Sequence, residues 1–416
     1  IARIYRNNAS AHAVGYVSEI SPRDIRKKKY LKDINIPGIA IGKTGLESTL
    51  DENILGSPGF LRYEVNASGK KIKQVSIKKG QKGKTFRTTL DNDVQIFAAK
   101  LIENVSGAVC VMDIYNGEIV SMVSSPTFNP NSFVHGISQN DWDNLLNNKD
   151  KPMINKAISG LYPPGSTIKT LTALSALEND IVSPKLLVKC EGYIDLHGER
   201  FHCWKKKGHG IVGMRTALKQ SCDVYFYEVA RRLGIDRLSA TAEKFGLGKK
   251  ILTNYTEEKA GVVPNTKWKI KELGKNWYLG ETLHSGIGQG YFLTTPLQLC
   301  LMTAQIANGG FKIYPKILIE ENDKIGNLQK FLNHKNSTPG NVMSSSDKIY
   351  NFNLEPLFRN QENINLIKDA MFAATNEPGG TSYGSRHNKK KFVFAGKTGS
   401  SQIKRFTEAQ REAEVK

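Results

Sequence analysis

The sequence lacks any run that approaches the ~18 consecutive apolar residues of a membrane-spanning helix, and no signal peptide opens it. Cysteine is scarce, at 5 of 416 residues, and no internal repeat is evident. These absences exclude a self-contained membrane protein, a collagen and a small disulfide scaffold. Hydrophobic residues make up 39% of the chain and charged residues 24%, which predicts two or three domains with sizeable cores.

Acidic residues are in deficit, with 39 Asp and Glu against 59 Lys and Arg, so the net charge is +20. The basic residues form short runs spread along the chain, and no RNA-binding signature or zinc-finger spacing accompanies them. We therefore expect no nucleic-acid partner. Attraction to an anionic membrane surface or acidic polymer and a merely solvated Lys-rich surface both remain open.

Residues 1–100 are rich in Gly and Pro, and short alternating runs at residues 60–65 and 71–77 read as strands. This pattern predicts an extended, β-rich module with little core of its own. From about residue 101 the pattern becomes that of a compact domain. Apolar runs at 107–114 and 119–123 flank Asn116-Gly117, the favoured two-residue turn of a β-hairpin.

Helical spacing of apolar residues follows at residues 168–177, within 214–245 and at 295–308. A short strand is expected at residues 391–395, directly before Lys397-Thr398-Gly399-Ser400. The economical interpretation is an α+β fold, with an antiparallel sheet and a mostly helical subdomain.

The candidate chemistry begins with Ser166 and Lys169, at the start of the predicted helix after Pro163-Pro164-Gly165. Positions i and i+3 share a helix face, so Lys169 would lie beside Ser166. The positive end of the helix dipole favours a developing negative oxygen, and a desolvated, neutral lysine could accept the hydroxyl proton. Ser-x-x-Lys is common, however, and a helix-capping serine followed by a solvated lysine is the alternative.

Two further elements favour the catalytic interpretation. Ser221-Cys222-Asp223 lies about fifty residues downstream, and Lys397-Thr398-Gly399 follows far along the chain. The order Ser-x-x-Lys, Ser-x-Asn, Lys-Thr-Gly belongs to penicillin-binding proteins and class A β-lactamases. Asp223 stands where that pattern has Asn.

With these motifs the chain resembles the class B penicillin-binding proteins, and among them the penicillin-binding protein 2 group, the peptidoglycan D,D-transpeptidases of cell elongation. Supporting stretches are residues 45–47, 55–59, 161–169, 204–210, 221–227, 286–290 and 295–298. The resemblance implies a partial, non-catalytic pedestal (dimerisation-type) domain at 1–100. It also implies a transpeptidase domain of the serine β-lactamase-like fold at 101–416, without the family's last strands and C-terminal helix.

The resemblance assigns the acyl-transfer roles residue by residue. Ser166 would attack the D-Ala-D-Ala carbonyl of a stem peptide, Lys169 would act as base, and Ser221 would relay a proton to the leaving D-alanine. A carboxylate at Asp223 favours the ammonium form of Lys169 and so opposes its action as a base. We therefore expect Asp223 to orient the two amines by hydrogen bonding, with Lys397 offsetting its charge.

The third motif would bind the substrate. By resemblance, Lys397 and Thr398 would hold the substrate carboxylate, and Gly399 would allow close approach of the peptide. The backbone N–H groups of Ser166 and Ser400 would form the oxyanion hole. β-Lactams would acylate the same serine, and the chemistry would require no cofactor.

A structural zinc site is predicted separately from the spacing Cys190-x12-Cys203-x5-His209-x12-Cys222. Three thiolates and one imidazole complete a closed tetrahedral site, and some relatives in the penicillin-binding protein 2 group carry a metal-ligand cluster at similar positions. A Cys190–Cys203 disulfide is the alternative in an oxidising compartment. His197 and His202 are competing ligands. The remaining thiols, Cys110 and Cys300, are expected in the core.

Two other functions stay open on the same fold: a β-lactamase or D,D-carboxypeptidase, in which water accepts the acyl group, and a non-catalytic β-lactam-sensing or scaffold module. The resemblance implies a SEDS-type glycosyltransferase and elongation-complex proteins as partners. It also implies a location at the periplasmic face of the bacterial inner membrane, through an N-terminal helix that this sequence does not contain.

Overall fold

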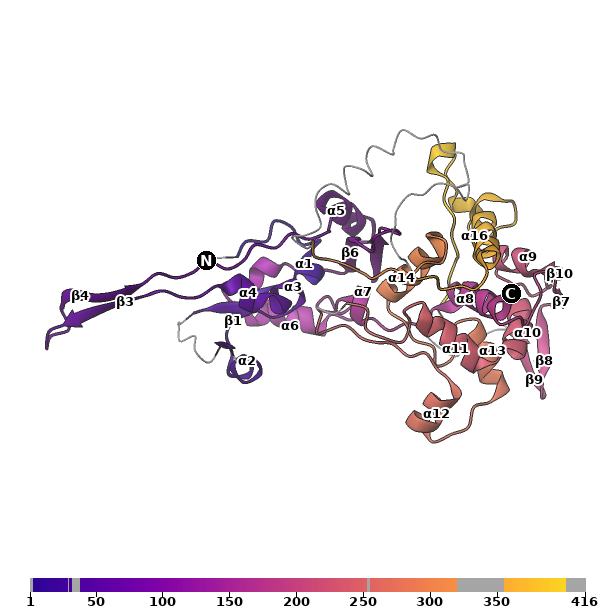
Figure 1. Cartoon of the computed structure of the whole chain (residues 1–416), viewed down its shortest axis with the longest axis horizontal. Coiled ribbons are helices and arrows are strands. Elements are labelled where there is room, and N and C mark those ends of the chain that lie inside the picture. The colour runs from indigo at the N-terminus through magenta and orange to yellow at the C-terminus, as the bar shows by residue number, and fades with distance from the viewer. Residues whose placement is uncertain (1–2, 29, 32–37, 253–254, 320–354, 402–416) are drawn as a thin grey trace.

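The computed structural model describes residues 3–28, 30–31, 38–252, 255–319 and 355–401. The molecule is elongated, with a two-stranded arm at one end and a helical body at the other (Figure 1). The first part contains α1 (Ala11–Val14), β1 (Val17–Glu19), α2 (Pro22–Lys27), β2 (Ala40–Gly42), α3 (Gly45–Thr49), α4 (Asp51–Leu55), β3 (Phe60–Val65) and β4 (Lys71–Lys78). The strands predicted at 60–65 and 71–77 are confirmed. Helices α1–α4 are not predicted, because helices this short show too little periodicity.

The arm is the antiparallel pair β3–β4, which runs from Phe60 opposite Lys78 to Val65 opposite Lys71 and is exposed along nearly its whole length. The rest of the first part does not form a separate core. Ala13 and Leu46 belong to one buried cluster with residues of the following domain, including Ile119. The sequence predicts that this module has little core of its own, and its buried residues indeed share a core with the following domain.

The hairpin predicted around Asn116-Gly117 is present as β5 (Gly107–Met112) and β6 (Ile119–Ser125), with α5 (Asn92–Leu101) beside β6. Its predicted two-residue turn is wrong. The Asp113 amide donates to the Glu118 carbonyl at 2.9 Å, and the Asp113 carboxylate accepts the amides of Tyr115 and Asn116 at 2.8 and 3.1 Å. These side-chain bonds stabilise a wider loop, in which only Gly117 takes a positive φ, of 77°.

The predicted helices are confirmed and form the body around α8 (Lys169–Glu178). Leu171 and Leu174 are fully buried there. Packed about α8 are α9 (Met214–Lys219), α10 (Asp223–Leu233), α11 (Ile235–Lys244) and α16 (Gln361–Asn376). The other helices are η2 (Pro130–Phe133), α6 (Gln139–Asn147), α7 (Lys156–Ser159), η3 (Gly165–Ile168), α12 (Thr266–Leu273), α13 (Leu279–Gly286), α14 (Pro296–Ala307), η5 (Tyr383–Ser385) and η6 (Lys390–Phe392).

Two small antiparallel pairs complete the body: β7 (Leu187–Cys190) with β10 (Gly210–Gly213), and β8 (Tyr193–Leu196) with β9 (Glu199–His202). Every ladder among the described residues has two strands. The chain contains both helices and strands, and every pair of named strands is antiparallel, so the predicted α+β class is confirmed.

The strand predicted at residues 391–395 is wrong. Residues 390–392 form the 3-10 turn η6, and no described strand pairs with the extended residues that follow. Their hydrogen bonds go to α16 instead: the Gly396 amide donates to the Met371 carbonyl at 3.2 Å, and the Asn376 amide side chain donates to the Phe394 carbonyl at 2.8 Å. A β-strand needs a ladder partner, and a helix cannot supply one.

No helix within the described ranges is long and apolar enough to cross a membrane. The predicted end of the transpeptidase domain, after residue 401, lies outside the described residues.

Candidate active site

The Ser166 turn forms because two glycines, Gly165 and Gly288, allow backbones to approach closely. Ser166 lies in η3, which leads directly into α8. Gly165 has φ +56°, and a Cβ there would lie 2.4 Å from the Ser400 carbonyl oxygen. The Gly165 amide donates to the Gly288 carbonyl at 2.9 Å. The 286–290 turn and the Lys397–Ser400 segment thus hold Ser166 at the start of α8, with its side chain partly exposed.

Lys169 is fully buried at the first position of α8. Its Nζ donates to the Asp223 carboxylate at 2.7 Å, to the Ser221 carbonyl at 2.9 Å and to the Ser221 hydroxyl at 3.3 Å. Among the hydrogen bonds of the described chain, none joins Lys169 to the Ser166 hydroxyl. The Lys169 amine is therefore bound to the second motif, one helical turn from the serine.

Ser221 joins α9 to α10 in a left-handed conformation, with φ 54°, which is uncommon for a residue with a Cβ. Asp223 follows as the first residue of α10, and the Cys222 sulfur caps this helix by accepting the Tyr225 amide at 3.5 Å. The left-handed turn therefore presents the Ser221 side chain and the Asp223 carboxylate to Lys169.

Lys397 completes the polar centre, because its Nζ donates to the Ser221 hydroxyl at 2.9 Å and to the Thr398 carbonyl at 3.0 Å. Burial, together with the positive charge of Lys169, lowers the pKa of Lys397 from its ordinary value of 10.5 to about 7, and Asp223 opposes this shift only in part. The Ser221 hydroxyl is thus bonded to both amines.

The residues after Lys397 line the Ser166 turn. The Thr398 hydroxyl bonds to the Thr381 hydroxyl at 3.0 Å. A Cβ at Gly399 would lie 2.9 Å from the Thr167 methyl group, so only glycine fits without displacing its neighbours. The Gln289 side chain donates to the Ser400 carbonyl at 2.9 Å. The structure thus brings together all eight residues predicted for catalysis and substrate binding.

The sequence alone does not indicate the contacts of Trp204. Its backbone amide donates to the Asp223 carboxylate at 2.9 Å, and its indole N–H donates to the carbonyls of Gln220 and Ser221, both at 3.1 Å. The available signals are its position directly after the metal candidate Cys203 and its place at the start of the 204–210 stretch that resembles the family.

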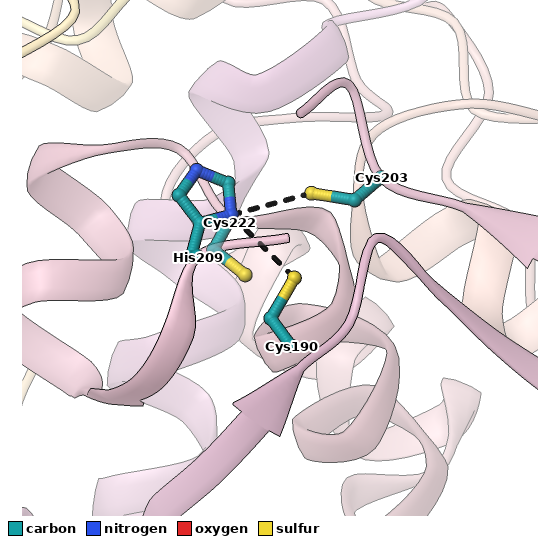
Figure 2. A group of neighbouring side chains, drawn as sticks. All are labelled: Cys190, Cys203, His209 and Cys222. Carbon is teal, nitrogen blue, oxygen red and sulfur yellow. Dashed lines mark hydrogen bonds between the residues drawn. The ribbon is translucent and has the colours of Figure 1, made fainter. Parts of the chain in front are cut away.

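The predicted metal ligands gather in one buried group, within 4.8 Å of one another (Figure 2). The sulfurs of Cys190 and Cys203 each lie 3.5 Å from His209 Nδ1. Ligand bonds of 2.3 Å to sulfur and 2.0–2.1 Å to nitrogen, at a tetrahedral angle, give a sulfur–nitrogen separation of about 3.5 Å. The donor types and spacing therefore fit zinc. All the described cysteines are free thiols.

The competing ligands do not join this group: of the histidines in the described chain, His209 alone does. Cys110 and Cys300 pack against the core cluster that contains Ile119, as predicted. Burial raises the pKa of the Cys300 thiol to about 11.

With the fold and the geometry of the candidate site described, comparison with known proteins identifies the family. Residues 107–414 match the penicillin binding protein transpeptidase domain, and residues 1–88 match the penicillin-binding protein dimerisation domain. The chain belongs to the penicillin-binding protein transpeptidase family. Its resemblance to the penicillin-binding protein 2 group is confirmed by relatives and solved structures.

The chain is 35% identical to the peptidoglycan D,D-transpeptidase MrdA of Acinetobacter baumannii, over 96% of this chain and 56% of that protein. It is 32% identical to MrdA of Escherichia coli strain K12, over 95% of this chain and 60% of that protein. The chain thus spans somewhat more than half the length of these curated relatives.

Two solved structures are similar over 97% of this chain, each at 31% identity. The complex of penicillin-binding protein 2 and MreC from Helicobacter pylori gives a TM-score of 0.81 over 70% of that chain. Pseudomonas aeruginosa penicillin-binding protein 2 in complex with WCK 5153 gives 0.78 over 80% of that chain.

Proposed function

We propose that this chain carries the catalytic centre of a peptidoglycan D,D-transpeptidase, which cross-links stem peptides through an acyl-enzyme on Ser166 during cell-wall elongation and is a target of β-lactams. The observation that carries the proposal is the Ser221 hydroxyl, bonded to Lys397 at 2.9 Å and Lys169 at 3.3 Å. A buried amine and a partly buried amine joined through one hydroxyl give a route for moving a proton at a serine acylation site.

In the proposed reaction the Ser166 oxygen attacks the carbonyl of the penultimate D-alanine as the neutral amine of Lys169 takes its proton. The C–N bond to the terminal D-alanine then breaks. The proton reaches the leaving amine through Ser221, and the peptide remains esterified to Ser166. An amine of a second stem peptide then attacks the ester carbonyl. The C–O bond to Ser166 breaks, the amine's proton passes to the Ser166 oxygen, and the amide cross-link forms.

Asp223 is the residue that needs an explanation, since an anion 2.7 Å from Lys169 Nζ favours its charged form. Its two oxygens have separate partners: one accepts from Lys169, and the other from the Trp204 amide at 2.9 Å. We assign Asp223 the role of orienting Lys169. The charge of Lys397 offsets part of its negative charge.

Substrate contacts follow from the segment beside the Ser166 turn. Lys397 and Thr398 would bind the substrate carboxylate, and Gly399 leaves room for the peptide backbone. The amides of Ser166 and Ser400 would stabilise the tetrahedral oxyanion, at roughly 3–4 kcal/mol per donor by analogy with other enzymes. The close contact of Gly165 with Ser400 supports this pairing.

The partners and location belong to the proposal as well. Structures similar to this chain include penicillin-binding protein 2 with MreC and a peptidoglycan synthase complex. We propose elongation-complex proteins and a SEDS-type glycosyltransferase as partners, at the periplasmic face of the inner membrane. We also propose a boundary near residue 100 between the pedestal and transpeptidase domains, which the matches to 1–88 and 107–414 support.

Fluorescent penicillin labelling tests the assignment directly. The protein should gain one covalent adduct, mapped to Ser166 by mass spectrometry, and Ser166→Ala should gain none. Ser183→Ala, at an exposed serine outside the site, is the matched control and should label as the wild type does. Slow release of the adduct supports a transpeptidase. Rapid release supports a β-lactamase or carboxypeptidase, and labelling without cross-linking by the complete protein supports a sensing module.

We also propose that Cys190, Cys203, His209 and Cys222 hold a structural zinc ion. The 3.5 Å sulfur–nitrogen separations support zinc binding, and the free state of all three cysteine side chains favours it over a disulfide. Metal analysis of the purified protein should find one equivalent of zinc, and Cys203→Ser should lose it while Cys300→Ser keeps it. If the protein contains no metal and the sulfurs of Cys190 and Cys203 do not react with a thiol reagent, a disulfide between them is established instead.

A further inference from the structure

The Ser221 turn has an unfavourable backbone conformation, and hydrogen bonds to the Ser221 carbonyl stabilise it. A serine at φ 54° persists only where surrounding contacts over-determine it. The Ser221 carbonyl accepts from two side chains: Lys169 Nζ at 2.9 Å and the Trp204 indole N–H at 3.1 Å. The same indole N–H also reaches the Gln220 carbonyl at 3.1 Å, so it spans the peptide group that leads into the turn.

Trp204 differs from a core tryptophan, because the residue is 59% exposed. Its packing against His209, with ring centroids 5.4 Å apart, and its position after Cys203 tie it to the metal-candidate loop. The loop is held at its base, where the Tyr227 hydroxyl donates to the His202 carbonyl at 3.1 Å. Because most of the Trp204 surface is exposed, burial of the ring contributes little to stability. The contribution of this side chain therefore comes from the directional hydrogen bonds of its N–H group to the Ser221 turn.

We propose that Trp204 is a positioning residue: its indole N–H holds the Ser221 turn in the left-handed conformation that presents the Ser221 hydroxyl to both lysines. Its backbone amide, which binds Asp223, fixes the other end of the motif. This inference rests on the proposed function. Trp204 itself need not touch the substrate.

The test separates the N–H group from the ring. Trp204→Phe removes the indole N–H, and site-specific replacement of Trp204 by 3-benzothienylalanine keeps the bicyclic shape without that donor. Trp142→Phe, in the aromatic cluster with Phe133, is the matched control. We expect both changes at 204 to slow acylation by a chromogenic cephalosporin about tenfold, with the binding constant of the first complex little changed. The control should acylate at the wild-type rate.

Amide hydrogen exchange gives a readout that does not require acylation. The amides of Ser221 and Cys222, which donate to Leu218 and Ala217 at 3.2 and 2.9 Å, should exchange faster in both variants at 204. Unchanged exchange and acylation in the benzothienylalanine variant would overturn the positioning role and leave the proposed function intact. A wild-type protein that is never acylated on Ser166 would overturn the function, while faster exchange in the variants would still support the structural part of the inference.

Discussion

The lowered pKa of Lys397 predicts how acylation depends on pH. With a pKa of about 7, roughly half of the Lys397 side chains are neutral at pH 7 and about nine-tenths at pH 8. The charged groups that face it are Lys169 and Asp223. If the charged form binds the carboxylate of the β-lactam, acylation efficiency must fall through neutral pH and decline about tenfold per pH unit above 8.

The assay is the second-order acylation rate of the wild type and of Lys397→Arg, measured with a chromogenic cephalosporin from pH 5.5 to 9. A guanidinium remains charged throughout this range, so the falling limb should disappear in the variant even if its overall rate is lower. A wild-type profile without a falling limb between pH 6 and 8, or an arginine variant that keeps this limb, would refute the assignment of Lys397 as the charged carboxylate ligand.

The same shift predicts the pH dependence of folding. The unfolded chain binds a proton at Lys397 up to about pH 10.5 and the folded chain only up to about pH 7, so this residue makes the protein more stable as pH rises between these values. From pH 7 to 8.5 the gain is about 2 kcal/mol. Urea denaturation at both values should detect it, and Lys397→Met should lack it. An equal gain in wild type and variant would contradict the lowered pKa.

Three further predictions follow from the described contacts. Asp223→Asn should slow acylation about tenfold or more, because the charge-assisted bond that orients Lys169 is weakened; unchanged acylation by stopped-flow measurement would disprove the orienting role. Removing the proposed zinc ion with a chelator should lower the thermal midpoint by several degrees, and zinc, but not magnesium, should restore it; an unchanged midpoint would contradict the zinc site. Leu174→Ala, in the fully buried face of α8, should lower the free energy of unfolding by about 2–5 kcal/mol, whereas Leu187→Ala, at 64% exposure, should change it little in the same denaturation assay.

Prediction from sequence succeeded where short-range periodicity determines the structure. The α8 pattern of Leu171 and Leu174 predicts a helix whose buried face lies toward the body, and the Ser-x-x-Lys spacing then fixes Ser166 and Lys169 one turn apart. The eight residues predicted for catalysis and substrate binding come from three distant segments, so only the resemblance to a family, and not local physics, could place them together.

The failures share a physical cause, which is competition between local preference and a specific partner. Asn116-Gly117 favours a tight turn, but the Asp113 carboxylate binds two loop amides and widens it. Residues 391–395 have strand-forming composition, yet the backbone after η6 bonds to α16. The indole bond of Trp204 depends on a loop crossing near Ser221, which no local sequence pattern encodes.

The position of Cys222 links the two candidate centres more tightly than proximity alone. Its side chain belongs to the Cys/His group, while its chain neighbours Ser221 and Asp223 contact Lys169. Rotation about the Cα–Cβ bond can move the Cys222 sulfur only a short way, so a larger displacement would turn the peptide groups on both sides. Trp204 adds a second link of the same kind, since it follows Cys203 and binds the same turn. A closed structural metal site would therefore stabilise the uncommon backbone at Ser221 and not only the loop around it, and metal loss should raise amide exchange at Ser221 before the body of the domain unfolds.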